Sequence, residues 1–119
     1  MSLNKVMLIG NVGRDPKVRY TGPDMAVAEF SLATTEPAYT LKNGTEVAER
    51  TDWHRIVVWG KLAKLVEQYV KKGVKLFIEG SIHTRTYEAR DGSQGRVTEV
   101  WASKIEFCSV APNSNIPTQ

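Results

Sequence analysis

The chain has 119 residues, 41% of them hydrophobic, and carries a formal net charge of +3. This length suits one compact domain, and the hydrophobic share is too high for a disordered chain. Because no apolar run could cross a bilayer and no signal peptide is recognisable, we expect a cytoplasmic protein without a membrane partner. The one cysteine, Cys108, cannot form an internal disulfide, which agrees with a reducing compartment. The mild positive charge permits a polyanionic partner without requiring one.

Strand patterns dominate the chain. Strand-forming residues lie between turn residues in five segments: 4–12, 26–35, 51–59, 74–87 and 96–107. A short extended piece, 17–20, follows the first of them. Gly10 and Gly80 mark points where a strand can bend. The polar stretch 36–49 contains Asn43-Gly44 and predicts a long hairpin loop.

One segment, 61–71, has the period of a helix. Its apolar residues fall three and four positions apart and form one stripe: Leu62, Leu65, Val66, Tyr69 and Val70. Gly60 interrupts the strand before this segment, Gly73 ends it, and Lys71 and Lys72 complement the negative end of the helix dipole. The predicted order is three strands, one helix and two strands.

This order predicts an all-β chain with one helix. A helix between the third and fourth of five curled strands is the layout of the OB-fold, a five-stranded Greek-key barrel. We expect this domain to cover residues 1–109. Residues 110–119 contain Pro112, Pro117 and small polar residues with little to bury, and predict a disordered tail.

The strand at 51–59 carries the clearest functional signal. Its alternation places Trp53, Arg55 and Trp59 on one side and His54 and Ile56 on the other. Large aromatic rings on an outer surface usually meet a partner. Unpaired bases stack on such rings for about 1–3 kcal/mol each, and a guanidinium contacts phosphate or adds a cation–π interaction. The alternative is that the tryptophans close the core or pack on a neighbouring subunit.

Aromatic and cationic residues also recur together near two predicted loops. Arg85, Tyr87 and Arg90 lie around the connection of the last two strands, and Tyr39 and Lys42 lie in the loop at 36–49. Further cations that could contact phosphates are spread along the chain: Lys5, Arg14, Lys17, Arg19, Lys61 and Arg96. For any one of these cations, a solvated surface charge is the simpler interpretation.

No constellation of residues predicts catalysis, a metal site or a cofactor. His54 and His83 lie on different strands, and no spacing of Cys and His matches a metal site. Ser31 and Ser81 lack the context of a nucleophile elbow, and no phosphate-binding glycine loop opens the helix. We therefore expect a binding protein and not an enzyme.

A series of motifs runs in order along the chain up to about Cys108. They are NKV at 4–6, GNVGRDP at 10–16, VRY at 18–20, FSLAT at 30–34, TDWHRIVVWGKLA at 51–63, YVKKG at 69–73 and IEG at 78–80. Together they resemble the bacterial single-stranded DNA-binding proteins. The resemblance implies an OB-fold that assembles as a homotetramer and wraps single-stranded DNA at the nucleoid, in replication, recombination and repair.

The resemblance also implies roles for particular residues. It assigns base stacking to four aromatic residues: Trp53, Trp59, Tyr87 and Tyr39. It places His54 at a subunit contact, where we also expect Phe77. Members of the family typically end in an acidic tip that recruits replication and repair proteins. Since 115–119 has no acidic run, we expect such partners only for a longer protein that carries the tip.

Two other binding functions stay open from the residues alone. The aromatic surface could be buried against a protein, as in an adaptor module, or it could prefer RNA, as in a cold-shock-like protein. Quenching of tryptophan fluorescence by unstructured single-stranded DNA distinguishes the first of these from DNA binding, and a preference for RNA over matched DNA identifies the second.

Overall fold

Strands make up most of the chain between residues 1 and 108, the part that the computed structural model describes. The predicted tail at 110–119 lies outside these described residues. The elements in chain order are β1 (Val6–Val12), β2 (Lys17–Tyr20), β3 (Ala26–Glu36), β4 (Tyr39–Thr40), β5 (Glu46–Val47), β6 (Arg50–Trp59), α1 (Gly60–Tyr69), β7 (Lys75–Glu88) and β8 (Gln94–Phe107).

The main sheet curls until it closes on itself. Its strands follow the order β1-β7-β8-β6-β3-β2, and β1 pairs a second time with β3 through Asn11–Ala33 and Val12–Leu32. β6 and β8 are parallel, whereas the other pairs are antiparallel. The result is a barrel of β1, β7, β8, β6 and β3, with β2 continuing along β3.

Closure depends on a close approach at Gly10. A methyl group on Gly10 would overlap the carbonyl oxygen of Ala33 in β3, so only glycine lets β1 approach β3 so closely. Gly80 plays the same part between β7 and β8, beside a register shift at Glu79/Gly80. The register shift agrees with the bend predicted at Gly80, whereas at Gly10 the observed feature is the close approach of two strands.

The core follows the predicted alternation. In β3 the residues Ala26, Ala28, Phe30 and Leu32 are all buried, as are Ile56 and Val58 of β6. These residues form one cluster with the apolar side of α1, in which Ala63 and Val66 are fully buried. The helix therefore stabilises the barrel by burying its apolar stripe against β3 and β6.

The helix boundaries differ from the prediction of 61–71. The helix begins at Gly60, which takes a φ of +65° directly after the extended Trp59 and so turns the chain. It ends at Tyr69, because Val70 adopts an extended conformation and is buried in the core. Lys71 and Lys72 consequently lie beyond the last helical turn. No helix between residues 1 and 108 is long and apolar enough to span a membrane.

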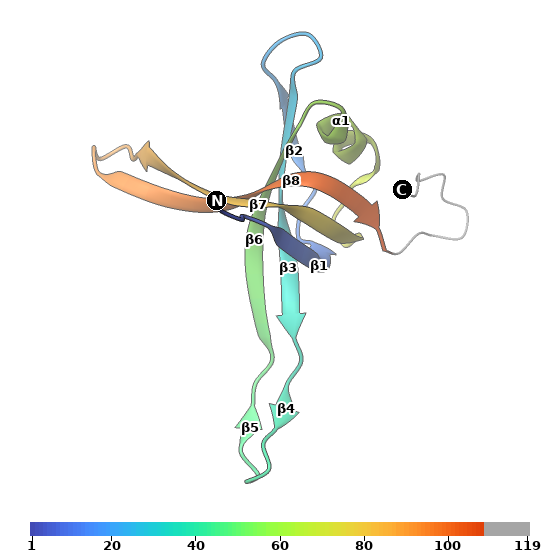
Figure 1. Cartoon of the computed structure of the whole chain (residues 1–119), viewed down its shortest axis with the longest axis vertical. Helices are drawn as coiled ribbons and strands as arrows, with labels where there is room; N and C mark the ends of the chain where they lie inside the picture. Colours follow the sequence, from blue (N-terminus) through green and yellow to red (C-terminus); the bar gives the residue numbers. More distant parts are fainter. Residues whose placement is uncertain (109–119) are drawn as a thin grey trace.

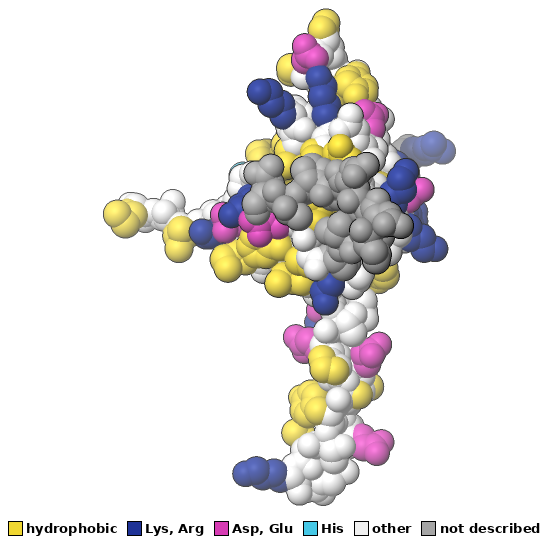
Figure 2. Space-filling view, turned by 90° about the vertical axis from the view of Figure 1, so that its right-hand side faces the viewer, with side chains coloured by type: hydrophobic (Ala, Val, Ile, Leu, Met, Phe, Trp, Pro, Cys, Tyr) yellow, Lys and Arg dark blue, Asp and Glu magenta, His cyan; other side chains and the backbone are white. Residues whose placement is uncertain are grey.

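Two long arms leave the barrel (Figure 1). One is the end of the β7–β8 hairpin. The other extends β3 and β6 to a small hairpin of β4 and β5, in which Tyr39 pairs with Val47. The stretch predicted as a loop at 36–49 thus contains a short β-ribbon. Figure 2 shows acidic side chains along this second arm, which includes Glu36, Glu46 and Glu49.

The closure at Gly10 is tested by Gly10→Ala. We expect this change to lower the free energy of unfolding by about 1–3 kcal/mol, because the new methyl group must push β1 away from β3. Urea denaturation measures the change. Gly22→Ala is the matched control, since a methyl group there meets only the Met25 side chain, at 3.5 Å. Equal stability of the two variants would contradict a role for Gly10 in closure.

Candidate nucleic-acid interface

Large aromatic side chains share one outer face of the barrel and its β7–β8 arm. The alternation of β6 places Trp53 and Trp59 on this side, opposite the buried Ile56. The parallel register with β8 adds Trp101, and the register of β7 with β8 adds Tyr87. We call the surface defined by Trp53, Trp59, Trp101 and Tyr87 the aromatic face.

Trp53 is held by the loop after β1. Its side chain is 62% exposed, yet a methyl group on Gly13 would overlap its six-membered ring. The ring therefore lies directly on the backbone of Gly13, which limits its motion and leaves its other surface open. Arg14 borders a shallow pocket with Trp53 and Ser31, so a cation lies beside the exposed ring.

Tyr87 is supported in the same way near the tip of the β7–β8 arm. Its pairing partner is Gly95, and a methyl group on Gly95 would overlap the Tyr87 ring. An aromatic side chain that covers a cross-strand glycine fills the space that the glycine leaves open. Tyr87 is 48% exposed and borders a pocket with Arg55, Arg85 and Arg96.

Trp59 contacts Trp101, which in turn contacts His83, and the sequence interpretation selected neither of these two rings. Its ring centroid lies 5.0 Å from that of Trp101, at an interplanar angle of 77°. Trp101 in turn stacks on His83, with centroids 3.6 Å apart and planes inclined by 15°. Trp101 and His83 come from β8 and β7, and only the strand register shows that they share the side of Trp59.

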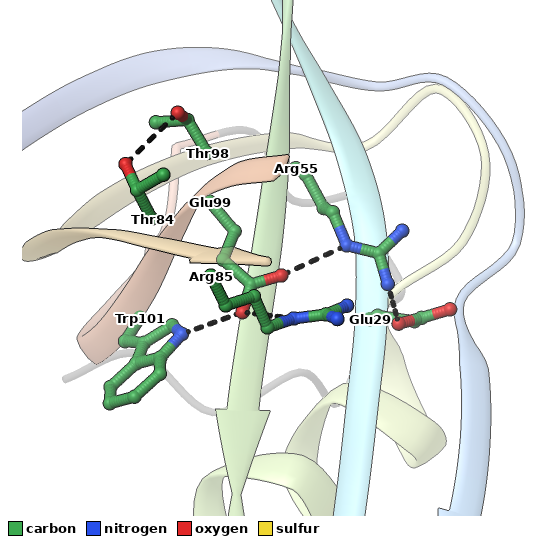
Figure 3. Close-up of polar contacts among 7 residues, drawn as sticks. All are labelled: Glu29, Arg55, Thr84, Arg85, Thr98, Glu99 and Trp101. Carbon is green, nitrogen blue, oxygen red and sulfur yellow. Dashed lines mark hydrogen bonds and ion pairs between the residues drawn. The ribbon is translucent and has the colours of Figure 1, made fainter. Parts of the chain in front are cut away.

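A buried carboxylate lies behind these rings (Figure 3). Glu99 is 4% exposed, and its Oε1 accepts hydrogen bonds from the Trp101 indole at 2.9 Å and from Arg85 Nε at 3.3 Å. Its Oε2 accepts one from Arg55 Nε at 3.1 Å. A second nitrogen of Arg55 donates to Glu29 of β3. Four strands thus meet in one polar network, and every buried side-chain nitrogen and oxygen atom among residues 1–108 has a hydrogen-bond partner.

This network keeps Glu99 ionised. Burial alone would raise the pKa of Glu99, but the hydrogen bonds from Trp101 and Arg55 and the charge of Arg85 outweigh it and lower the pKa overall. A charged Glu99 in turn holds both guanidinium groups. Arg55 and Arg85, predicted to contact phosphate, are therefore engaged with carboxylates.

The network makes the middle of the aromatic face nearly neutral, because Glu29 and Glu99 offset Arg55 and Arg85. Among residues 1–108, three other predicted phosphate-binding arginines form no ion pair with a carboxylate: Arg14, Arg90 and Arg96. All three are exposed: Arg14 lines a pocket with Trp53, Arg96 lines one with Tyr87, and Arg90 lies in the turn between β7 and β8. The arginines that lie among the rings are therefore different residues from those that form no such ion pair.

The remaining predicted residues lie away from the aromatic face. Tyr39 is exposed on the small ribbon at the end of the β3–β6 arm, and Lys5 pairs with Glu79 at 3.6 Å. Lys61 lies in the first turn of α1 beside Ser103. His54 points to the other side of β6, where its Nε2 lies 2.8 Å from the Thr34 hydroxyl. Phe77 is half-buried on β7 and pairs with the exposed Ile9.

The fold and this face define an OB-fold protein that presents exposed aromatic rings surrounded by cations. Comparison with known proteins supports this class. Residues 3–108 match the Single-strand binding protein family. The single-stranded DNA-binding protein of Bacteroides thetaiotaomicron is 51% identical over 109 residues, which cover 92% of this chain and 68% of that protein. That of Neisseria meningitidis is 45% identical over 107 residues, 90% of this chain and 60% of that protein.

A solved structure of Plasmodium falciparum SSB in complex with ssDNA superposes with a TM-score of 0.82 and 38% sequence identity. The match covers 92% of this chain and 97% of the Plasmodium chain. The chain therefore belongs to the single-strand binding protein family, and the predicted OB-fold is confirmed. The chain is shorter than its bacterial relatives and spans 68% and 60% of the two named above.

Glu99→Gln tests the network, because glutamine keeps the shape and removes the charge. We expect the free energy of unfolding at pH 7 to fall by about 1–3 kcal/mol, since three donors lose a charged acceptor. The pKa of Glu99 is lowered from its ordinary 4.5 in the folded protein. The difference in the free energy of unfolding between the wild type and Glu99→Gln is therefore complete above pH 4.5. It shrinks as the pH falls through the lowered pKa of Glu99.

Urea unfolding of both proteins at pH 7 and pH 3 measures this difference. Glu106→Gln is the matched control, because Glu106 forms only a half-exposed pair with Lys104 at 3.3 Å, and we expect a change within about 0.5 kcal/mol. A Glu99→Gln difference of the same size at both pH values would contradict the assigned role of the charge.

Proposed function

We propose that this protein binds single-stranded DNA through the aromatic face, without reading its sequence. The observation that carries the proposal is the set of open rings on one surface: Trp53, Trp59 and Tyr87, each close to or above half exposed. Each flat ring offers an unpaired base an apolar surface of its own shape, and every base has such a surface.

The same rings favour single strands over duplexes. In a duplex each base is already stacked between its neighbours, so a protein ring gains contact only after unpairing. The neutral middle of the face suits uncharged bases, and exposed arginines at its border suit the phosphates: Arg14, Arg90 and Arg96. Tyr39, on its separate arm, remains a predicted fourth stacking residue that would extend the path of the strand.

The proposed role is protection of exposed single strands in DNA replication, recombination and repair, in the cytoplasm at the nucleoid. Its support is membership of the family and the geometry of the face. The role needs binding and no chemical step, and the network of Glu99 serves it by fixing side chains. Recruitment of other replication proteins is proposed only for a form with an acidic tip.

We further propose that the protein assembles as a homotetramer. Met7 and Ile9 of β1 are more than half exposed and lie next to Phe77 on one surface. Only the end of β1 pairs with β3, so the rest of the strand has an open edge. Open edges and exposed apolar side chains are commonly covered by another subunit.

Ile9→Lys tests the assembly. We expect light scattering to give the mass of four chains for the wild type and a smaller mass for the variant, because a lysine cannot be buried unpaired between subunits. Lys71→Ala, an exposed change just after α1 and away from this surface, should leave the mass unchanged. A wild-type mass of one chain at micromolar concentration would contradict the tetramer.

Trp53→Ala tests the binding function. A fluorescein-labelled oligo-dT, titrated with protein and followed by anisotropy, should bind the wild type far more tightly than an equal-length duplex. We expect the variant to bind about five- to a hundredfold more weakly, the loss of one stacked base at about 1–3 kcal/mol. The loss should be similar for oligo-dC, because stacking does not read sequence.

Arg96→Ala gives the contrasting variant. Each phosphate contact contributes about −0.7 to the slope of log affinity against log salt concentration. Arg96→Ala should therefore make the slope less steep by about 0.7, whereas Trp53→Ala should leave it unchanged. Wild-type protein that does not bind oligo-dT at low salt would overturn the proposed function and favour an adaptor whose aromatic face binds protein.

A further inference from the structure

His83 adds one more ring to the aromatic face, beside Trp101. The imidazole of His83 lies parallel to the Trp101 indole, with centroids 3.6 Å apart and planes inclined by 15°. Trp59 of β6, the strand on the other side of β8, packs edge to face against Trp101. Since β7, β8 and β6 are adjacent in the sheet, the rings form a row across three strands with Trp101 in the middle.

Trp101 is the fixed member of this row. Its indole Nε1 donates to Glu99 at 2.9 Å, and Glu99 is itself held by Arg55 and Arg85. Trp101 is more buried than Trp59, as expected for a ring with aromatic neighbours on two sides. It therefore supports other rings better than it offers a surface of its own.

His83 is the outer member on β7. Its Nε2 lies 2.8 Å from the Ser81 hydroxyl, which fixes the ring in its plane, and Trp101 covers one side of the ring. No other aromatic ring stacks on the imidazole among residues 1–108. Tyr87 follows on the same side of β7, about 13 Å further along an extended strand. His83 thus lies between Trp59 and Tyr87 on the face.

We propose that His83 is a further base-stacking residue and that Trp101 is the residue that positions it. A base of the bound strand stacks on the side of the imidazole that faces away from Trp101 and continues the row of rings. The proposal rests on the proposed binding of single-stranded DNA. It makes a continuous line of stacking positions from β6 to the β7–β8 arm.

Three substitutions at one position separate stacking from packing. We expect His83→Ala to weaken oligo-dT binding about fivefold or more. His83→Phe, which keeps a flat ring, should restore most of the affinity, whereas His83→Leu, which fills the space without a ring, should not. Thr84→Ala is the control on the opposite side of β7 and should bind as the wild type does. Circular dichroism verifies that each variant is folded.

Trp101→Leu tests the positioning role. If Trp101 acts through His83, the loss of affinity in the double variant with His83→Ala should be smaller than the product of the two single losses. The only two histidines of the chain, His54 and His83, also give a direct spectroscopic readout. On addition of oligo-dT the ring proton resonances of His83 should shift upfield by stacking, and more than those of His54.

The outcomes separate this inference from the proposed function. Wild-type binding with equal affinities for His83→Leu and His83→Phe, or with unmoved His83 resonances, would overturn the role of His83 alone. Additive losses in the double variant would overturn the positioning role of Trp101. Absence of wild-type binding would overturn the proposed function, and the stacking role of His83 with it.

Discussion

The charge of Glu99 is the constraint on which the aromatic face depends. A buried carboxylate is costly unless it is hydrogen-bonded, and Glu99 meets that demand with donors from three strands: Arg55 of β6, Arg85 of β7 and Trp101 of β8. Because each donor is held at a fixed place, one side chain aligns three neighbouring strands. The same bonds fix the indole between His83 and Trp59, and neutralise the arginines that the residue pattern alone assigns to phosphate.

The exposed rings are fixed without becoming buried. Trp53 lies on Gly13 and Tyr87 on Gly95, so the backbone supports one side of each ring while the other stays open. A ring that is already immobile loses little conformational freedom when a base stacks on it. The arginines near the rings also fall into two groups. The arginines paired with carboxylates lie among the rings, so the proposed function assigns base stacking and phosphate attraction to different residues of this surface.

The sequence predicts those features that depend on local period, and it misses those that depend on register. Alternation in β3 and β6 predicts the buried set, including Leu32 and Ile56, and it places Trp53 and Trp59 outside. The apolar stripe predicts the helix. Its predicted end at residue 71 is wrong, because Val70 is extended and buried in the barrel core. The role of Glu99 could not be predicted. Two of its partners lie on other strands, and the alternation of residues within one strand does not indicate that β6 pairs in parallel with β8.

The central claim is that bases, more than phosphates, hold the strand on the aromatic face. Its most direct test compares oligo-dT with an oligonucleotide of the same length made of abasic sites, which keeps every phosphate and removes every base. The account predicts that the abasic strand binds at least a hundredfold more weakly, since several stacked bases contribute about 1–3 kcal/mol each, with a similar dependence on salt. Equal affinities for the two strands would show that the protein holds DNA by its phosphates alone and would contradict the account.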